Sequence, residues 1–255
     1  MKLSNFLSLL FITFSIHCHQ PAKVGLAIVA TGKYLQFVQP LIESARKHFC
    51  TNSQVTYFVF TDGQLDTDAA DVVLLPHGIV TWPFATMCRC HAYVHHADAL
   101  ARMDYVFACD ADMLFVNEVG EEILSERVAT HHPGYYGRSG TFETRRESAA
   151  YVDASVARPY FAGGFYGGTA QEFLKIARTM KENAAKDLEK DIIAIWHDES
   201  HLNCYCAHNP PTLMLLPSYC MPERVPVQWY SQVVRNMPAK LIALDKDHSA
   251  LRVQR

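Results

Sequence analysis

The first half of the chain alternates short apolar runs with longer stretches in which apolar residues recur at helical spacing. The apolar runs predict strands at 24–30, 54–60, 72–75 and 105–109. Residues 34–49 and 87–103 have the helical spacing. Strands that alternate with helices in this way predict an α/β fold with a mainly parallel sheet.

The run at 105–115 is apolar except for Asp110 and Asp112, which stand one residue apart where the strand should end. A continuous apolar run of this length suits an inner strand of a parallel sheet. Ligands in such sheets bind just beyond the carboxyl ends of the strands, where two carboxylates could hold a hard divalent cation against phosphate oxygens. An Asp pair can equally cap a turn, so the pattern alone leaves both interpretations open.

The pattern becomes irregular after residue 131. Residues 132–137 predict an aromatic-rich turn, and the polar residues 139–155 predict a mobile surface loop. In 160–168, four glycines alternate with aromatic residues. They either let the backbone approach a ligand or form a tight turn between two core strands. Thr169 is expected to cap a helix whose apolar stripe is Phe173, Ile176, Ala177 and Met180.

The segment WHDESH at 196–201 places two acids beside a tryptophan. Asp198 or Ser200 is expected to cap a helix that has Glu199 in its first turn, which explains the acids but not Trp196. An aromatic face suits the apolar face of a sugar ring. A carboxylate near a helix N-terminus is expected to stay ionised at neutral pH, and an ionised carboxylate stabilises or attacks an oxocarbenium-like centre.

Composition narrows the class of protein. The chain has 255 residues, of which 49% are hydrophobic, enough for one large domain or two tightly joined subdomains. Its formal net charge of -3 gives no electrostatic case for nucleic-acid binding. Cys88, Cys90 and His91 form a single cluster, which is weak evidence for zinc, so we expect buried free thiols.

The N-terminus carries Lys2 and then an apolar run over 6–16, which resembles the charged and apolar regions of a signal peptide. The run is short for a membrane span of about 20 residues. We therefore expect residues 1–20 to be a signal peptide or a short signal-anchor, with a misassigned start as the alternative. A true signal implies membrane association or a secretory, cell-envelope route, and its absence implies a cytoplasmic protein.

Five motifs follow one another along the chain: VFTD at 59–62, DAD at 110–112, HPGYYG at 132–137, GGFYGG at 163–168 and WHDESHLN at 196–203. In order and spacing they resemble glycosyltransferase family 6, which contains the ABO blood-group transferases, α1,3-galactosyltransferase and Forssman synthase. The resemblance implies a single GT-A catalytic domain over 21–255, with a mainly parallel, Rossmann-like nucleotide-binding half fused to an acceptor-binding half. It also implies retaining transfer of a sugar from a UDP-sugar to the 3-OH of a β-galactoside-terminated glycan, with an α1,3 linkage.

The resemblance assigns roles to individual residues. Glu199 matches the proposed nucleophile or ion-stabilising carboxylate, and His132 and Trp196 match acceptor-contacting positions. Asp110 and Asp112 match the motif that holds Mn²⁺, or another divalent cation, and the diphosphate. The other donor-side positions are Val29, Ala30 and Tyr34 at the uracil, Arg89 and Asp198 near the donor sugar, and Lys246 and Arg252 in a tail that closes on the pyrophosphate.

Donor choice depends on Ala162, Gly163 and Gly164, which match the segment that separates galactose from N-acetylgalactosamine donors. Three small residues leave room for a 2-acetamido group, so the expected donor is UDP-GalNAc. A UDP-galactose enzyme of the same fold and an inactive sugar-binding protein are the alternatives.

The chain also departs from the family pattern. Many bacterial relatives replace the two acids by Asn and need no metal, whereas this chain keeps both, so metal dependence is expected. The first strand follows the apolar N-terminus almost directly, which suits a minimal, bacterial-type member. Residues 139–155 and 219–230 match poorly, which leaves the acceptor glycan open.

Overall fold

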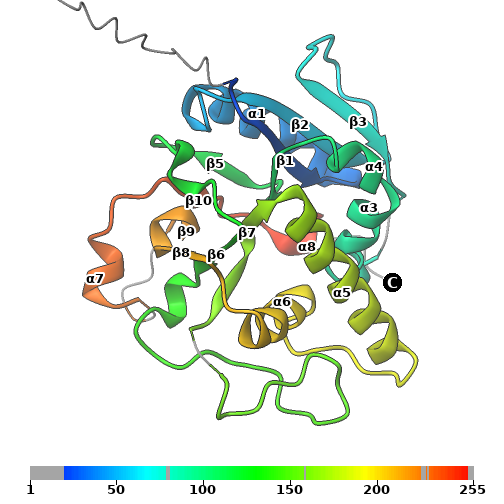
Figure 1. The fold of residues 1–255 in the computed structure, drawn as a ribbon, viewed down its shortest axis with the longest axis vertical. Helices are drawn as coiled ribbons and strands as arrows, with labels where there is room; N and C mark the ends of the chain where they lie inside the picture. Colours follow the sequence, from blue (N-terminus) through cyan, green and yellow to red (C-terminus); the bar gives the residue numbers. More distant parts are fainter. Residues whose placement is uncertain (1–19, 79–80, 158, 225–227, 229, 252–255) are drawn as a thin grey trace, which may run out of the picture.

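The computed structural model describes residues 20–78, 81–157, 159–224, 228 and 230–251. A seven-stranded sheet runs through the centre of this part of the chain (Figure 1). Its strands, in spatial order, are β3 (Val72–Pro76), β2 (Gln54–Thr61), β1 (Lys23–Val29), β4 (Tyr105–Asp110), β7 (Phe161–Thr169), β6 (Arg127–His131) and β8 (Leu213–Leu215). Neighbouring strands pair in parallel except where β7 runs antiparallel to both β4 and β6. The expected mixed α/β fold with a mainly parallel sheet is confirmed.

A second, three-stranded sheet joins the segment after the Asp pair to the C-terminal part of the chain. Its central strand, β10 (Leu241–Ala243), pairs antiparallel with β5 (Met113–Phe115) and parallel with β9 (Met221–Pro222). Because β5 begins directly after Asp112, this sheet brings the residues that follow β10 next to the Asp pair.

Helices cover both faces of the large sheet (Figure 1). Their bounds are α1 (Val38–His48), α2 (Phe84–Met87), α3 (Arg89–His95), α4 (Ala97–Leu100), α5 (Ala170–Leu188), α6 (Asp198–His208), α7 (Gln232–Arg235) and α8 (His248–Leu251), and the 3-10 turns are η1 (Gly32–Phe37), η2 (Glu121–Ile123), η3 (Pro133–Tyr135) and η4 (Pro217–Tyr219).

The alternation of side chains along the strands produces two cores. On β1, Leu26 and Ile28 face the core that contains α1, whereas Ala27 faces the core that contains α3 and α5. The strand residues on both faces are apolar because helices bury both faces. This explains why the strands appear in the sequence as continuous apolar runs rather than alternating ones.

The four strands expected in the first half are present to within one residue, but the helices differ. The stretch 34–49 begins as the 3-10 turn η1 and becomes α-helical only at Val38. The stretch 87–103 is not one helix, because the backbones of Cys88 (φ -93°, ψ 2°) and His96 (φ -107°, ψ 28°) leave helical geometry and divide it into short pieces.

The tight turn considered for 160–168 is wrong, because these residues form the buried strand β7. Two of its glycines are required by packing. A Cβ on Gly167 would lie 2.3 Å from the Val106 carbonyl oxygen, and one on Gly168, which has φ +150°, would lie 2.0 Å from the Glu126 carbonyl oxygen. The glycines thus let β7 pack closely against its neighbours. Thr169 caps α5 as expected, accepting a hydrogen bond from the N–H of Glu172.

The expectation of a surface loop over 139–155 is also wrong in part. Glu143, Ser148, Ala150 and Val152 are buried, and a short bridge pairs Glu143 with Tyr151. The segment therefore packs into the molecule instead of lying over it.

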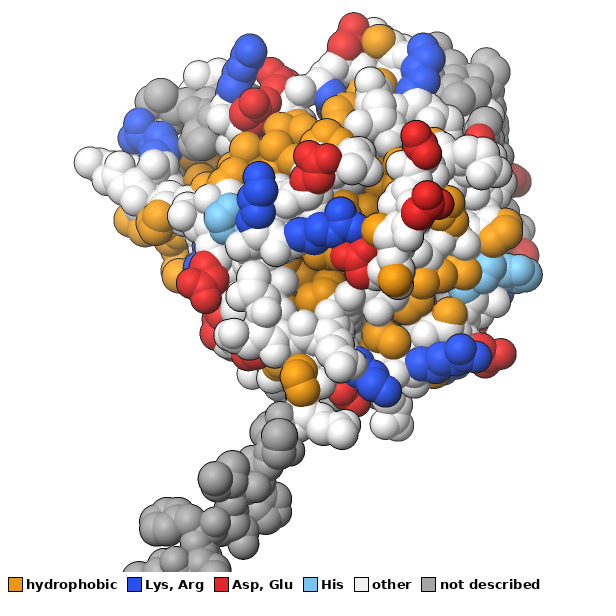
Figure 2. All heavy atoms as spheres, turned by 90° about the horizontal axis from the view of Figure 1, so that it is seen from above, with side chains coloured by type: hydrophobic (Ala, Val, Ile, Leu, Met, Phe, Trp, Pro, Cys, Tyr) orange, Lys and Arg blue, Asp and Glu red, His pale blue; other side chains and the backbone are white. Residues whose placement is uncertain are grey.

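The expected signal segment falls almost entirely in residues 1–19, outside the described part of the chain. In the described part, no helix combines the length and the apolar character that a membrane span requires. On the face seen in Figure 2, basic and acidic side chains are interspersed rather than segregated.

Candidate active site

The carboxyl ends of β1 and β4 bring the expected uracil-binding edge next to the Asp pair. The parallel register pairs Val29, the last residue of β1, with Asp110, the last residue of β4. Ala30 is buried and donates its N–H to the Phe60 carbonyl (2.9 Å), and Tyr34 follows in η1. Val29 and Asp110, which are 81 positions apart in the sequence, therefore share one edge of the sheet.

Asp110 and Asp112 lie at the turn between β4 and β5, and both pair with cations of this chain. The Asp112 side chain is 6% exposed and forms an ion pair with Lys246. The Asp110 side chain is 35% exposed, and its Oδ1 accepts a 2.5 Å hydrogen bond from Nη1 of Arg89. The two carboxylates thus have different environments, one enclosed and one open to an incoming ligand.

Arg89, the first residue of α3, joins three segments of the site. Besides Asp110, its guanidinium contacts Asp198 at 2.8 Å, and its Nη1 donates to the Gly163 carbonyl oxygen at 3.3 Å. Burial raises the pKa of Asp198 to about 6 although Arg89 acts in the opposite direction. A single buried arginine thus fixes the distance between the Asp pair, β7 and the start of α6.

Glu199 lies in the first turn of α6, and its Oε2 accepts a 2.8 Å hydrogen bond from the Gly163 N–H. Burial raises the pKa of Glu199 to about 7, outweighing the lowering effect of the Gly163 N–H and of the nearby Tyr160 hydroxyl. At neutral pH this carboxylate is therefore only partly ionised, whereas its helix position led us to expect full ionisation. Desolvation favours the neutral acid by more than the helix N-terminus favours the charge.

The expected caps of α6 are also wrong. The residue that precedes the helix is His197, with φ 52° and ψ -125°. Ser200 instead uses its hydroxyl to accept a hydrogen bond from the Trp196 N–H at 2.9 Å. The unusual backbone at His197 turns the chain between the exposed Trp196 and the buried Asp198.

Sequence reasoning missed Asn203, which fastens α6 to β7. Its Oδ1 accepts from the Phe161 N–H at 2.8 Å, and its Nδ2 donates to the Phe161 carbonyl at 2.8 Å and to the Glu199 carbonyl at 2.9 Å. The signal was available, because Asn203 closes the WHDESHLN motif one helical turn after Glu199.

The segment Ala162–Gly164 coincides with an irregularity in the sheet. The β6–β7 register jumps from Ala129 opposite Tyr166 to Thr130 opposite Ala162, so Gly163 and Gly164 have no place in that ladder. This frees the N–H of Gly163 for Glu199 and its carbonyl for Arg89.

The same two glycines let the strand pack closely against the acids. A Cβ on Gly163 would lie 3.4 Å from the Glu199 Cβ, and one on Gly164 would lie 3.1 Å from the Cys220 Sγ and 3.4 Å from the Asp110 Oδ2. Cys220 was not predicted as a site residue, and its position within the poorly matching stretch 219–230 gave no signal.

The two residues expected to contact the acceptor are presented differently. Burial, followed by the charge of Arg138, lowers the pKa of His132 to about 4, so its imidazole is neutral at pH 7. Because its Nδ1 accepts from the Gly134 N–H at 3.0 Å, its Nε2 carries the proton and can donate it. Trp196 is 45% exposed, three positions before Glu199. A cavity of about 700 Å³ lies beside His132. Its lining includes His131, Tyr135, Phe142 and Tyr160.

The C-terminal tail folds back over the Asp pair. The Leu244 N–H donates to the Asp112 carbonyl at 2.9 Å, and the Lys246 ammonium lies 5.5 Å from the centre of the Tyr34 ring. Lys33 donates to the Ala250 carbonyl at 2.8 Å, which fixes α8 near η1. Arg252, the other tail residue of interest, lies outside the described residues.

The side chains placed to ligate a metal ion are few in the described part of the chain. Among the described residues, no group of three or more His, Cys, Asp or Glu side chains is arranged to hold a metal, including the cluster around Cys88, Cys90 and His91. The two carboxylates at 110 and 112 fit a hard cation that takes its other ligands from phosphate oxygens and water. Asp112 would then exchange its contact with Lys246 for the cation.

Comparisons with known proteins agree with this geometry. The family model described as Glycosyltransferase family 6 matches residues 12–253. The chain is 33% identical over 245 residues to histo-blood group ABO system transferase 1 of Rattus norvegicus, a match covering 91% of this chain and 69% of the relative. It is 32% identical over 252 residues to globoside alpha-1,3-N-acetylgalactosaminyltransferase 1 of Homo sapiens, covering 92% and 71%. It is also 27% identical over 234 residues to the O-antigen biosynthesis glycosyltransferase WbnI of Escherichia coli, covering 89% and 96%. The chain therefore belongs to glycosyltransferase family 6 and is a hexosyltransferase of that family's retaining α1,3 type.

Proposed function

We propose that this enzyme transfers N-acetylgalactosamine from UDP-GalNAc to the 3-OH of a β-galactoside acceptor. The observation that carries the proposal is a chain of hydrogen bonds from Glu199 to Asp110. The Gly163 N–H donates to Glu199, and Arg89 donates both to the Gly163 carbonyl and to Asp110. A carboxylate that can face an anomeric carbon is thereby held close to carboxylates that can face a diphosphate. Human globoside alpha-1,3-N-acetylgalactosaminyltransferase 1, which is named for α1,3 transfer of N-acetylgalactosamine to globoside, is 32% identical to the chain.

On the donor side, Val29, Ala30 and Tyr34 would receive the uracil at the end of β1. Asp110 and Asp112 would hold a divalent cation, which would supply positive charge to the diphosphate leaving group. Lys246 and Arg252 would add cationic charge from the tail as the diphosphate departs. These roles are supported by the finding that all of these residues that the structure describes lie at one edge of the sheet.

On the acceptor side, His132 and Trp196 would orient the β-galactoside. The Nε2–H of neutral His132 can donate to a sugar oxygen, and the exposed Trp196 ring can lie against the apolar face of a sugar. In a retaining reaction the acceptor oxygen enters on the face from which the diphosphate leaves. Glu199, once ionised, would stabilise or attack the positively charged anomeric centre from the other face.

The preference for GalNAc over galactose is inferred from the absence of side chains at Gly163 and Gly164. A single added carbon on either glycine would reach contact distance from Glu199, Cys220 or Asp110. A site wall made of backbone at this point presents less bulk to a 2-acetamido group than a wall with larger side chains would.

The test is a glycan-array screen of the purified chain with Mn²⁺ and either UDP-GalNAc or UDP-galactose, with Glu199→Gln as the control for catalysis. Faster transfer from UDP-GalNAc supports the proposal. A clear preference for UDP-galactose would overturn the donor assignment and leave the reaction type intact. Binding of UDP-sugars without transfer from either donor would instead indicate a sugar-binding protein.

A further inference from the structure

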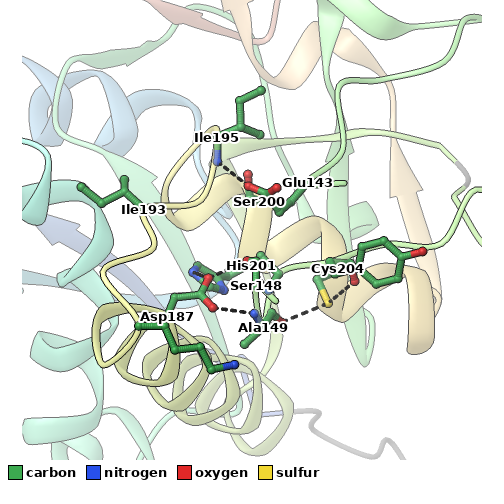
Figure 3. Close-up of polar contacts among 12 residues, drawn as sticks. Glu143, Ser148, Ala149, Asp187, Ile193, Ile195, Ser200, His201 and Cys204 are labelled. Carbon is green, nitrogen blue, oxygen red and sulfur yellow. Dashed lines mark hydrogen bonds and ion pairs between the residues drawn. The ribbon is translucent and has the colours of Figure 1, made fainter. Parts of the chain in front are cut away.

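Two buried carboxylates, Glu143 and Asp187, have no role in the site proposed above. Both lie next to α6 and the chain that leads into it (Figure 3). Glu143 is 3% exposed and Asp187 is fully buried. Burying a carboxylate is costly unless hydrogen bonds satisfy it, so the partners of these two indicate what they hold in place.

Glu143 fastens the chain directly before Trp196. Its Oε2 accepts a 2.9 Å hydrogen bond from the Ile195 N–H and a 2.6 Å hydrogen bond from Nη2 of Arg145. Arg145 in turn donates to the Ile193 carbonyl at 2.6 Å. The Glu143 carboxylate and Arg145 thus form hydrogen bonds with the backbone on both sides of Ala194.

The two large apolar side chains of this stretch pack little, and only the small Ala194 between them is buried. Ile193 is 38% exposed and Ile195 is 48% exposed, although both are large apolar residues. A segment whose apolar side chains face solvent has to be held by its backbone. The two contacts through Glu143 and Arg145 supply that hold.

The stretch ends at a residue with a strained backbone. His197 has φ 52° and ψ -125°, a conformation that residues with a side chain rarely adopt. Such a conformation persists only where the surrounding structure determines it from both sides. The anchors at Ile193 and Ile195 lie on one side of His197, and α6, tied to β7 by Asn203, lies on the other.

Asp187, at the end of α5, holds the segment that carries Glu143. Its carboxylate accepts from the Ser148 hydroxyl at 2.6 Å and from the Ala149 N–H at 2.5 Å, and it lies 3.8 Å from His201 on α6. Its own carbonyl accepts from the Ile192 N–H at 2.8 Å. Asp187 therefore connects α5, α6 and the segment 143–151 at one point (Figure 3).

We propose that Glu143 and Asp187 are positioning residues that hold the backbone of 192–197 in its strained form and thereby fix Trp196 and Glu199 relative to each other. The inference rests on the proposed roles of those two residues. The nucleotide edge at β1 and β4 lies on other strands and does not depend on this hold. Loss of the hold therefore affects acceptor use and turnover while UDP binding is retained.

The experiment compares Glu143→Gln with Glu147→Gln, the same substitution at an exposed position of the same segment. A glutamine keeps the shape but replaces one carboxylate oxygen with an NH₂ group. Either Oε1 is lost, which accepts from the backbone N–H and Nε of Arg145, or Oε2 is lost, which accepts from the Ile195 N–H and Nη2 of Arg145. In both cases two hydrogen bonds and the charge that holds Arg145 are removed. Misplacement of reacting groups on the scale of an ångström costs about 100-fold in rate. We expect Glu143→Gln to lower kcat by about 10- to 100-fold and to raise the acceptor KM, with the UDP Kd unchanged in calorimetry. Glu147→Gln is expected to match the wild type.

Three outcomes separate the possibilities. Wild-type kinetics in a folded Glu143→Gln variant would overturn the inference, as would an equal loss of UDP affinity and acceptor use. Failure of the wild-type chain to transfer from any donor would instead defeat the proposed function. Should Glu143→Gln not fold, Arg145→Lys removes the planar fork that contacts both Glu143 and Ile193, and Asp187→Asn with Asp191→Asn as its exposed control tests the second anchor. The same split between acceptor use and UDP binding is expected in both.

Discussion

The backbone N–H of Gly163 lies 2.8 Å from Oε2 of Glu199 and donates a hydrogen bond to it. This contact joins the irregular part of β7 to the first turn of α6, so the strand proposed to bound the donor sugar also orients the carboxylate. A substitution in the strand at this point should therefore change donor preference as well as turnover.

Gly163→Ala is expected to shift donor preference from UDP-GalNAc toward UDP-galactose. The added Cβ would lie 3.4 Å from the Glu199 Cβ, an ordinary contact, so the fold should tolerate it. The methyl group would take space from the acetamido group, and one carbon in such a pocket changes the ratio of kcat/KM values by about 10-fold or more. The measurement is kcat/KM for both donors. Gly78→Ala, where an added Cβ meets nothing within 4 Å, should leave the ratio unchanged, and an unchanged ratio in Gly163→Ala would contradict the assignment.

Activity should fall as the pH decreases through about 7, because the folded-state pKa of Glu199 is raised to about 7 by burial. A raised carboxyl pKa means that the acid is neutral below that pH, and the neutral form cannot stabilise a cationic centre. The acid limb of kcat/KM reports this group in the free enzyme. Tyr160→Phe removes a group that lowers the pKa of Glu199, so the limb should move to higher pH. Tyr105→Phe, at the opposite end of β4, is the control. An acid limb below pH 5, or one that Tyr160→Phe leaves in place, would show that a different group is responsible.

The sequence could predict the strands that lie inside the sheet and the Asp pair at the end of one of them, because burial on both faces gives a continuous apolar run. It could not predict β7, since four glycines in nine residues have the composition of a turn. Two of them, Gly167 and Gly168, are required because backbone atoms of neighbouring segments lie within 2.3 Å of where a Cβ would be, and such contacts exist only in the folded chain. The same holds for Glu143 and for the pKa of Glu199. Both depend on burial by segments far away in the chain, and neither a polar stretch nor a helix position reveals it.

Asn203→Ala is expected to destabilise the protein by about 2–4 kcal/mol, because the buried N–H and carbonyl of Phe161 lose their partner. Since Asn203 also contacts the Glu199 carbonyl, turnover should fall even at temperatures where the variant is folded. Urea unfolding gives the first quantity and steady-state kinetics the second. The exposed Asn52→Ala provides the matched control. A free energy of unfolding within 0.5 kcal/mol or so of the wild-type value, the range of ordinary surface substitutions, would refute this account.

The ion pair between Lys246 and Asp112 leads to the last prediction. A divalent cation at Asp110 and Asp112 has to displace this ammonium, so the lysine competes with the cation in the absence of donor. Without UDP, Lys246→Ala should therefore bind Mn²⁺ several-fold more tightly than the wild type. The gain in binding free energy should be similar to the free energy of a partly buried ion pair, which the cation no longer has to break. The same variant should turn over more slowly, because the tail loses a charge that would stabilise the departing diphosphate. Calorimetric titration with Mn²⁺, beside activity assays with and without a chelator, measures both effects. Lys47→Ala, at the exposed end of α1, should change neither. Full activity in the presence of the chelator would exclude the cation, and weaker Mn²⁺ binding by Lys246→Ala would show that the lysine assists the cation instead of competing with it.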